Sequence, residues 1–400
     1  MTSTPTTKLP AERPASRPAA EEETFQELLA RWAGRVDAQI ERLYPGTPAG
    51  CRDAGSPLMA YDCGGEPTDC SGDPAHARVG GRLHAALTEP VRYLVGAGGG
   101  RWRPGLMMAV IEVLGGDSEH FGPLVASMEL AHTGSLMVDD VEDGASLRRG
   151  RATVHTAFGT STALNAGTFA YFTLDRAVRL TVPEDLVLRA RLYDAYLAAL
   201  RAAHAGQALD IQGHRTEMDQ AVRTEDAEPA LEAVRLTHRL KSGAMVGAGL
   251  EAAALVCGVD DRQRTALVAF GSAIGTAYQI TDDVADLEGV VRDGVVTKQV
   301  GEDLHNGKVT MPLAHAVARL PRRRLAPLWH AVRDGRADRT TVLGAAAELR
   351  DCGALEACVR EAQSLVAETW SRLEPMLPQV PGTRMLLDMA RHVVQVNRIA

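Results

Sequence analysis

Val138-Asp139-Asp140-Val141-Glu142-Asp143 is one of two stretches with the pattern D-D-x-x-D, and Thr281-Asp282-Asp283-Val284-Ala285-Asp286 is the other. On a helix, the first and fifth positions of this pattern stack on one face, and the second lies beside them. Each stretch therefore predicts a tight cluster of carboxylates. Because like charges this close repel by several kcal/mol at reduced dielectric, both clusters predict bound cations.

The residues before each cluster are largely apolar, from Leu130 to Val138 and from Ala273 to Ile280. The alternative interpretation, two solvated acidic helix ends, does not fit such surroundings. Carboxylate oxygens suit hard divalent ions, and Mg²⁺ typically takes a few carboxylates together with substrate phosphates. Two such helices facing each other would hold a diphosphate between metal ions.

Composition and periodicity predict an all-α protein. Hydrophobic residues make up 45% of the chain but aromatic residues only 4%, so the core must be built from Ala, Leu and Val. Alternating β-branched runs bounded by turns are scarce. Helical spacing of apolar residues extends over Thr24–Leu43, Ser127–Met137, Val187–Ala208, Ala266–Leu287 and Leu343–Leu373.

The chain divides into a tail and one folded domain. Residues 1–20 are rich in Thr, Pro, Ala and Ser and predict a disordered tail, with a docking or recruitment peptide as its alternative role. Residues 21–400 form the domain, interrupted by a long mobile loop over 45–81. Residues 213–229 are interpreted as a charged loop or a frayed helix end.

Charge and hydropathy exclude several classes of function. The net charge of -8 argues against nucleic acid as a partner. The sequence contains no run of about 18 apolar residues, so we expect no transmembrane segment. The N-terminal residues lack the apolar core of a signal peptide, so we expect a cytoplasmic protein. Cys51, Cys63 and Cys70 form no C-x-x-C pair, so reduced thiols are favoured over a zinc or redox site with His76.

Lysine is rare in this chain. Of 43 basic residues only Lys8, Lys241, Lys298 and Lys308 are lysines. A compact point charge is therefore expected to matter where lysine is retained. Three of the four lie in the second half of the chain, among the motifs described next.

Six motifs follow one another along residues 82–312. They are Gly98-Gly99-Gly100-Arg101-Trp102-Arg103-Pro104; Glu129-Leu130-Ala131-His132 running into the first cluster and Arg148-Arg149-Gly150; Gly206-Gln207-x-x-Asp210; Lys241-Ser242-Gly243-Ala244; Tyr278-Gln279-Ile280-Thr281 running into the second cluster; and Gly301-Glu302-Asp303-x-x-x-Gly307-Lys308-x-Thr310-x-Pro312. In this order they resemble the motifs of the trans-isoprenyl diphosphate synthases, the polyprenyl synthetase family.

The resemblance implies the fold and the reaction. The fold is the isoprenoid synthase fold, about a dozen helices around a central active-site cavity, and the family implies a homodimer. The reaction is Mg²⁺-dependent head-to-tail prenyl transfer, which joins isopentenyl diphosphate to an allylic diphosphate. The departing pyrophosphate needs stabilisation of its developing charge and removes the final proton, and the carbocation needs an apolar tunnel that excludes water.

The resemblance also assigns roles to individual residues. The metal ligands, for about three Mg²⁺ ions, are Asp139, Asp140, Asp143, Asp282 and Asp283, with Asp286 mainly in the outer shell. The groups that grip the allylic diphosphate are Arg148, Lys241 and Lys308, assisted by Lys298, and Gln279 orders a metal-bound water. The holders of isopentenyl diphosphate are Arg103, His132 and Arg149, with Arg101 nearby. Glycines 98–100 let backbone N–H groups approach phosphate.

Product length is expected to depend on side chains below the first cluster. Gly134 and Ser135 lie five and four positions before Asp139, where bulky rings stop chain growth in the family. Their small size predicts a C20 or longer product, as in a geranylgeranyl diphosphate synthase. Met128 and Ala131 are the next candidates for a floor, and Gly134→Phe is expected to shorten the product.

Two departures keep other functions open. Gly100 replaces the family's lysine, a phosphate contact worth roughly 1.5–3 kcal/mol, unless Arg101 compensates. Val138 replaces a common histidine. The chain could then be a class I terpene cyclase, or a prenyltransferase with a non-isopentenyl acceptor, on the same fold. A non-catalytic or scaffold-recruited subunit that acts through the N-terminal tail is the alternative of another class.

Overall fold

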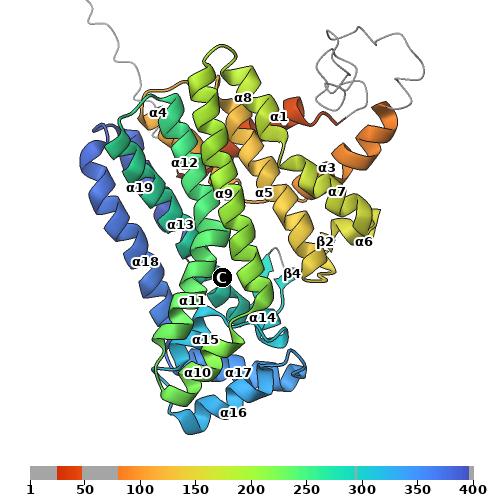
Figure 1. Cartoon of the computed structure of the whole chain (residues 1–400), viewed down its shortest axis with the longest axis vertical. Coiled ribbons are helices and arrows are strands. Elements are labelled where there is room, and N and C mark those ends of the chain that lie inside the picture. Colours follow the sequence, from red (N-terminus) through yellow and green to blue (C-terminus); the bar gives the residue numbers. More distant parts are fainter. Residues whose placement is uncertain (1–24, 47–79, 293–294, 396–400) are drawn as a thin grey trace, which may run out of the picture.

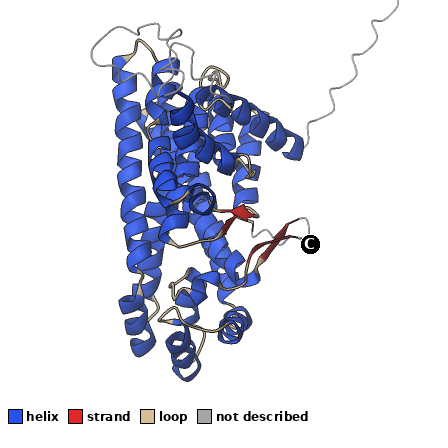
Figure 2. Ribbon diagram, turned by 90° about the vertical axis from the view of Figure 1, so that its right-hand side faces the viewer, coloured by secondary structure: helices blue, strands red, loops and turns tan. Residues whose placement is uncertain are grey.

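The computed structural model describes residues 25–46, 80–292 and 295–395, with side chains described except at 25–26 and 290–298. These residues are almost entirely helical, and the strands are confined to two short antiparallel hairpins (Figure 2). The all-α expectation is confirmed. The tail, most of the predicted loop at 45–81 and its three cysteines lie outside the described residues.

The first half of the fold ends with α9, which lies beside α12 of the second half (Figure 1). Its elements are α1 (Phe25–Leu43), η2 (a π-helix, His84–Thr88), α3 (Glu89–Val95), α4 (Trp102–Val113), α5 (Gly122–Glu142), β1 (Leu147–Arg148), β2 (Arg151–Ala152), α6 (Val154–Phe158), α7 (Thr160–Ala170), α8 (Thr173–Thr181) and α9 (Leu186–Gln212). Within this half, α5 packs against α1, α7 and α8.

The second half completes the bundle. Its elements are α10 (Arg215–Thr224), α11 (Glu228–His238), η3 (a π-helix, Arg239–Gly243), α12 (Ala244–Val256), α13 (Asp261–Glu288), β3 (Val290–Arg292), β4 (Val295–Lys298), α14 (Glu302–His305), α15 (Met311–Ala316), α16 (Arg322–Val332), α17 (Arg339–Asp351), α18 (Ala354–Leu373), η4 (a 3₁₀ turn, Glu374–Met376) and α19 (Pro381–Val393). Helix α13 packs between α12 and α18, and α9 covers α12.

Close glycine contacts position the π-helix η3. A Cβ on Gly206 of α9 would lie 2.3 Å from the backbone nitrogen of Lys241, and a Cβ on Gly275 of α13 would lie 2.7 Å from the carbonyl oxygen of Ser242. Only residues without a Cβ allow the two helices to approach η3 this closely. Because a π-turn widens the helix backbone, η3 fixes the position of Lys241 between α9 and α13.

Two local expectations were wrong. The single helix expected over Leu343–Leu373 is two helices, because Gly353 adopts φ +77 and ends the run between α17 and α18. The charged segment 213–229 contains helix α10, whose apolar side chains Met218, Ala221 and Val222 are buried. Within the described residues no helix is long and apolar enough to cross a membrane.

Candidate active site

The first acidic cluster lies at the C-terminal end of α5. Asp139 keeps 19% of its side chain exposed and accepts hydrogen bonds from Gln207 Nε2 at 3.0 Å and from Lys241 Nζ at 3.1 Å. Asp143, the residue that caps the helix, is bonded by Lys308 Nζ at 3.2 Å. The two exposed carboxylates of this cluster are therefore neutralised by lysines from distant parts of the chain.

Asp210 of α9 joins these two lysines. Lys241 Nζ lies 2.8 Å and Lys308 Nζ 3.6 Å from Asp210 Oδ2. Burial would lower the pKa of Lys308, but the charges of Asp210, Asp303 and Asp143 outweigh it and raise the pKa. Burial likewise opposes ionisation of Asp210, and the two lysines still hold its pKa below the usual value. Asp210, Lys241 and Lys308 are therefore charged at neutral pH.

Asp140 has a different environment from its neighbours. Its side chain is 0% exposed, and Arg148 donates to Oδ1 from Nε at 2.8 Å and from Nη2 at 2.5 Å. Oδ2 is buried without a partner. Burial is the main cause that raises the pKa of Asp140. In this arrangement Asp140 holds Arg148 in place and offers no open face to a metal ion, which differs from its expected role as a ligand.

The second cluster, on α13, also combines a partly exposed aspartate with buried ones. Asp282 is partly exposed. Asp283 is buried, accepts the backbone N–H of Met311 at 2.9 Å, and lies 3.4 Å from His238 Nε2. Asp286 is 1% exposed and faces the backbone N–H of Asp303 at 3.4 Å. The first aspartate of the pattern is the one that is partly exposed to solvent, and the other two fasten α13 to the chain around α14 and α15.

Arg148 connects the two clusters electrostatically. Burial would lower the pKa of its guanidinium, but the negative charges of Asp140, Asp139 and Asp282 together raise it. The charges of carboxylates from α5 and from α13 therefore both act on this one cation. That the two clusters face each other stays a prediction.

The open carboxylates fit divalent metal ions. Asp139, Asp143 and Asp282 present oxygen atoms, the donors that Mg²⁺ and Ca²⁺ prefer. Lys241 and Lys308 occupy the space beside the first cluster, and among the described residues no three His, Cys, Asp or Glu side chains lie together as a metal site. Metal binding by these three residues therefore stays a prediction.

A second site, which is basic, lies at the start of α4. Arg103 Nη1 is 3.2 Å from His132 Nε2 on α5. Burial, followed by the charges of Arg103, Arg149, Arg148 and Arg101, keeps the pKa of His132 well below its usual value. Burial also lowers the pKa of Arg103 and of Arg149. Such crowded positive charge, with a neutral histidine at its centre, suits an anionic ligand.

The glycine run lies directly on Arg149. Arg149 Nη1 donates to the carbonyl oxygens of Leu94, at 3.2 Å, and of Gly98. A Cβ on Gly99 would come within 3.0 Å of the guanidinium, and Gly99 adopts φ +143, so a side chain is excluded there. Gly100 differs, because a Cβ would meet nothing closer than Trp102 Cδ1 at 3.9 Å. The position of the missing lysine therefore has room for a side chain.

Arg101 does not compensate for the missing lysine. Its side chain is 5% exposed and bonds to Asp37 at 3.0 Å, Glu129 at 2.9 Å and the carbonyl oxygen of Val95 at 2.9 Å. The residue caps α4 with φ +45. All its nitrogens have partners inside the protein, so Arg101 anchors the start of α4 and leaves the anion site to Arg103, His132 and Arg149.

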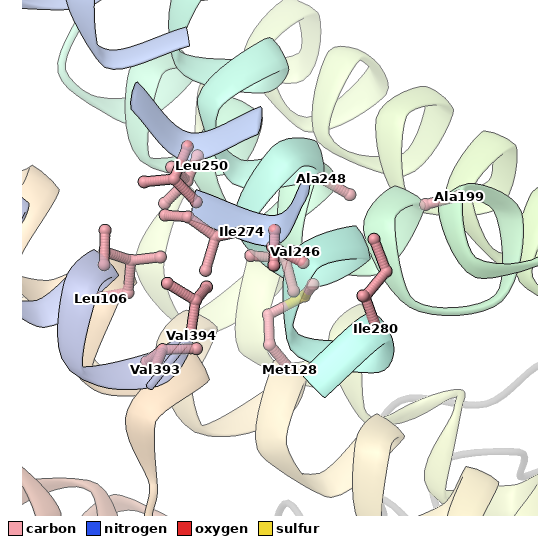
Figure 3. Packing of buried hydrophobic residues seen from close by; sticks show 14 of the residues in the cluster. Leu106, Met128, Ala199, Val246, Ala248, Leu250, Ile274, Ile280, Val393 and Val394 are labelled. Atoms are coloured by element: carbon pink, nitrogen blue, oxygen red, sulfur yellow. The ribbon is translucent and has the colours of Figure 1, made fainter. Parts of the chain in front are cut away.

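The expected chain-length residues separate into two groups. Met128, Ala131, Ser135 and Asp139 follow one face of α5, with Ser135 exposed one turn below the cluster and the first two buried. Met128 extends toward Val246 of α12 (Figure 3). This face forms a stripe that descends from the first acidic cluster into the apolar core.

Gly134 is not on this stripe. A Cβ on Gly134 would lie 2.3 Å from the carbonyl oxygen of Gly167, so the residue faces α7 at a close helix crossing. Its direction is about 100° around the helix from Ser135. The expectation that Gly134→Phe shortens the product is therefore not supported by this geometry, because the ring would displace α7 before it could block a tunnel.

Gln279 and Lys298 are the remaining residues with a predicted role at the diphosphate site. Gln279 Oε1 accepts a hydrogen bond from Ser242 Oγ at 2.8 Å, which ties α13 to η3. Lys298 ends β4, and its side chain lies outside the described set. Gln207 and Asp210 are site residues without a predicted role, although the motif Gly206-Gln207-x-x-Asp210 signals both, because its spacing places them on one face of α9.

Known proteins resemble this chain over much of its length. The model of the polyprenyl synthetase family matches residues 84–348. The farnesyl diphosphate synthase of Geobacillus stearothermophilus is 33% identical over 240 residues, which cover 58% of this chain and 76% of that protein. The geranylgeranyl diphosphate synthase of Cyanophora paradoxa is 31% identical over 231 residues, which cover 56% and 73%. Both relatives are prenyltransferases.

Similarity to solved structures extends over nearly the whole chain. The polyprenyl synthase from Caulobacter crescentus CB15, solved with calcium and isoprenyl diphosphate, has a TM-score of 0.69 and 25% identity and covers 95% of this chain and 100% of that chain. The geranylgeranyl pyrophosphate synthetase from Pyrococcus horikoshii has a TM-score of 0.70 and covers 93% and 99% at 23% identity. The expected all-α isoprenoid synthase fold is confirmed.

Proposed function

Because the chain belongs to the polyprenyl synthetase family, we propose that it condenses isopentenyl diphosphate with an allylic diphosphate, with Mg²⁺, to give a C20 or longer trans-polyprenyl diphosphate. The observation that carries this proposal is the meeting of two charged sites. Carboxylates of α5 and of α13 both raise the pKa of Arg148, and Arg148 and Arg103 both lower the pKa of His132, which supports an acidic site and a basic site next to each other.

The allylic diphosphate is assigned to the acidic side. Asp139, Asp143 and Asp282 hold about three Mg²⁺ ions, which when bound supply electrophilic stabilisation of the leaving pyrophosphate. Lys241 and Lys308 exchange their carboxylate partners for phosphate oxygens. Because both ammonium groups are already in place, they stabilise negative charge as the bond between carbon 1 and the diphosphate oxygen breaks.

Isopentenyl diphosphate is assigned to the basic side. Arg103 and Arg149 bind its diphosphate, and neutral His132 accepts from Arg103 while its other nitrogen is free to donate. The double bond then attacks the allylic carbon, and a proton is lost to the pyrophosphate. The stripe through Ser135, Ala131 and Met128 excludes water and receives the growing chain.

Product analysis tests this function. Purified protein with Mg²⁺, isopentenyl diphosphate and each allylic diphosphate from five to twenty carbons is expected to yield elongated prenyl diphosphates, and EDTA is expected to abolish them. If no allylic partner is elongated, the proposed reaction is wrong.

Gly100 supports a second candidate on the same fold. Without the family's lysine, the acceptor site carries one positive charge fewer, which favours a terpene cyclase or transfer to a non-isopentenyl acceptor. Geranylgeranyl diphosphate alone separates the two: a hydrocarbon formed without isopentenyl diphosphate identifies the cyclase.

A homodimer is part of the proposal. Several large apolar side chains are exposed on or beside α7, α8 and α9, namely Leu164, Phe172, Leu180, Leu186, Val187 and Leu197. Exposed apolar residues in such number mark a protein contact surface. Phe172 is 69% exposed, so Phe172→Glu is expected to shift the sedimentation coefficient from dimer to monomer.

A further inference from the structure

The guanidinium group of Arg103 lies against two aromatic rings. Its central carbon is 4.4 Å from the ring centroid of Trp102 and 5.0 Å from that of Tyr278. The rings themselves are 5.1 Å apart and inclined at 42°. Trp102 belongs to the first turn of α4, whereas Tyr278 belongs to α13 and lies one helical turn before Asp282.

Arg103 has no carboxylate partner to fix its position. Among the described residues no carboxylate lies within ion-pair distance of it, and its one side-chain hydrogen bond is the contact with His132. A partly buried cation of this kind needs other compensation. Aromatic faces supply it through their negative quadrupole, and a planar guanidinium can lie on such a face while its N–H groups stay free at the edge.

We propose that Trp102 and Tyr278 are positioning residues that hold Arg103 ready to bind the diphosphate of the metal-free substrate. Arg103 matters more here than in a site that also contains a lysine, because Gly100 contributes no charge. Arg101, with its buried bonds to Asp37 and Glu129, fixes the start of α4 and so the direction of Trp102. This inference rests on the assignment of that site under the proposed function.

The contact also places the two diphosphate sites in register. Tyr278 and Asp282 are four residues apart on α13, so the ring that touches Arg103 and the open carboxylate of the second cluster lie on the same helix face. A shift of α13 would therefore move the wall of the metal-free site together with a metal ligand.

Calorimetric titration with inorganic pyrophosphate in EDTA tests the proposal without turnover. Trp102→Leu is expected to weaken pyrophosphate binding about three- to thirtyfold, and Trp102→Phe, which keeps a ring, to restore most of the affinity. Tyr278→Leu is expected to act in the same direction. Unchanged affinity in Trp102→Leu, or equal losses in the Phe and Leu variants, would overturn the proposal.

A double-mutant cycle with Arg103→Gln identifies the route of the effect. If the ring acts through Arg103, Trp102→Leu has no further effect in the Arg103→Gln background. An equal loss in both backgrounds would mean that Trp102 acts only through the fold. Trp32→Leu is the matched control, since Trp32 packs on α4 at Gly105 and not on Arg103, and pyrophosphate affinity is expected to stay unchanged.

Steady-state kinetics separate this inference from the proposed function. In Trp102→Leu the KM for isopentenyl diphosphate is expected to rise about three- to thirtyfold, while the KM for the allylic diphosphate stays within twofold. Equal increases in both KM values would overturn the positioning role. If no elongation occurs in the wild-type protein, the proposed function fails, yet the pyrophosphate cycle still decides whether the rings position Arg103.

Discussion

The ammonium nitrogen of Lys241 lies 3.1 Å from Oδ1 of Asp139, although one residue belongs to the π-helix η3 and the other to α5. The contact exists because Gly206 lets α9 approach the backbone of η3. It neutralises a carboxylate that otherwise repels Asp140 and Asp143. A metal ion with a bound diphosphate can replace this pairing, since it offers a cation to Asp139 and an anion to Lys241.

The open carboxylates are expected to be essential for metal-dependent turnover. Asp139→Asn and Asp282→Asn each remove a ligand but keep the shape, so kcat should fall by about 10²–10³-fold, with higher Mg²⁺ needed for half-maximal activity. Steady-state assays across a Mg²⁺ titration measure both effects. The control is Asp351→Asn, an exposed aspartate at the end of α17, which should leave kcat unchanged. Wild-type Mg²⁺ dependence in Asp282→Asn would contradict the assignment.

Restoring a lysine at position 100 is expected to strengthen the acceptor site. The structure has space for this side chain, and one added phosphate contact is worth roughly 1.5–3 kcal/mol, so Gly100→Lys should lower the KM for isopentenyl diphosphate about ten- to a hundredfold. Initial rates at varied concentrations of isopentenyl diphosphate measure this KM. Gly344→Lys adds the same charge on α17, where a Cβ also meets open space, and should have no effect. An unchanged KM in Gly100→Lys would show that the acceptor is not bound here.

The sequence was sufficient to predict the helical class and the family fold, whereas the roles of Lys241 and Lys308 at a diphosphate stay predictions. These features depend on local periodicity and on motif order. It could not separate Asp139 from Asp140, because the difference is burial, and burial depends on how the β1–β2 hairpin brings Arg148 back to α5. The role of Arg101 was missed for the same reason: its partners Asp37 and Glu129 are distant in sequence.

Product length is expected to respond to Ser135 and Met128. Ser135→Phe places a ring on the stripe one turn below Asp139 and should shorten the main product by one or more isoprene units. Met128→Ala removes the deeper side chain and should lengthen it. Chromatography of dephosphorylated products measures both. Ser135→Ala, without added bulk, is the control and should keep the wild-type length; a wild-type product from Ser135→Phe would mean that the chain grows elsewhere.

The direction of Gly134 could not be predicted by counting positions from Asp139. Helical phase shows which residues share a face, but not which neighbouring helix covers that face, and here it is α7 through Gly167. The break between α17 and α18 was missed although Gly353 signals it, because the apolar periodicity continues on both sides of the glycine.

Glu361 on α18 is expected to make the free energy of unfolding depend on pH in the acid range. Burial would raise the pKa of Glu361, but bonds from His315 at 3.0 Å and Arg235 at 2.6 Å outweigh it and lower the pKa to about 2. The stabilisation is therefore complete above the unfolded value of 4.5 and is lost as the pH falls from there toward 2. Its full size is about 3 kcal/mol.

Denaturant unfolding between pH 2 and 7 measures this effect. The wild-type free energy of unfolding should fall in this acid range by more than that of Glu361→Gln, which has no carboxyl group to protonate. Glu368→Gln, exposed on the same helix, is the control and should keep the wild-type profile. Parallel profiles for the wild type and Glu361→Gln would contradict the assigned pKa.

A crystal structure with Mn²⁺ and pyrophosphate, using the anomalous signal of the metal, tests most directly whether opposed carboxylates trap metal ions around one diphosphate. The account predicts anomalous peaks bonded to Asp139 and Asp143 on one side and to Asp282 on the other, all contacting a single pyrophosphate held by Lys241 and Lys308. Metal ions bound at only one cluster, or a pyrophosphate that contacts no metal, would contradict it.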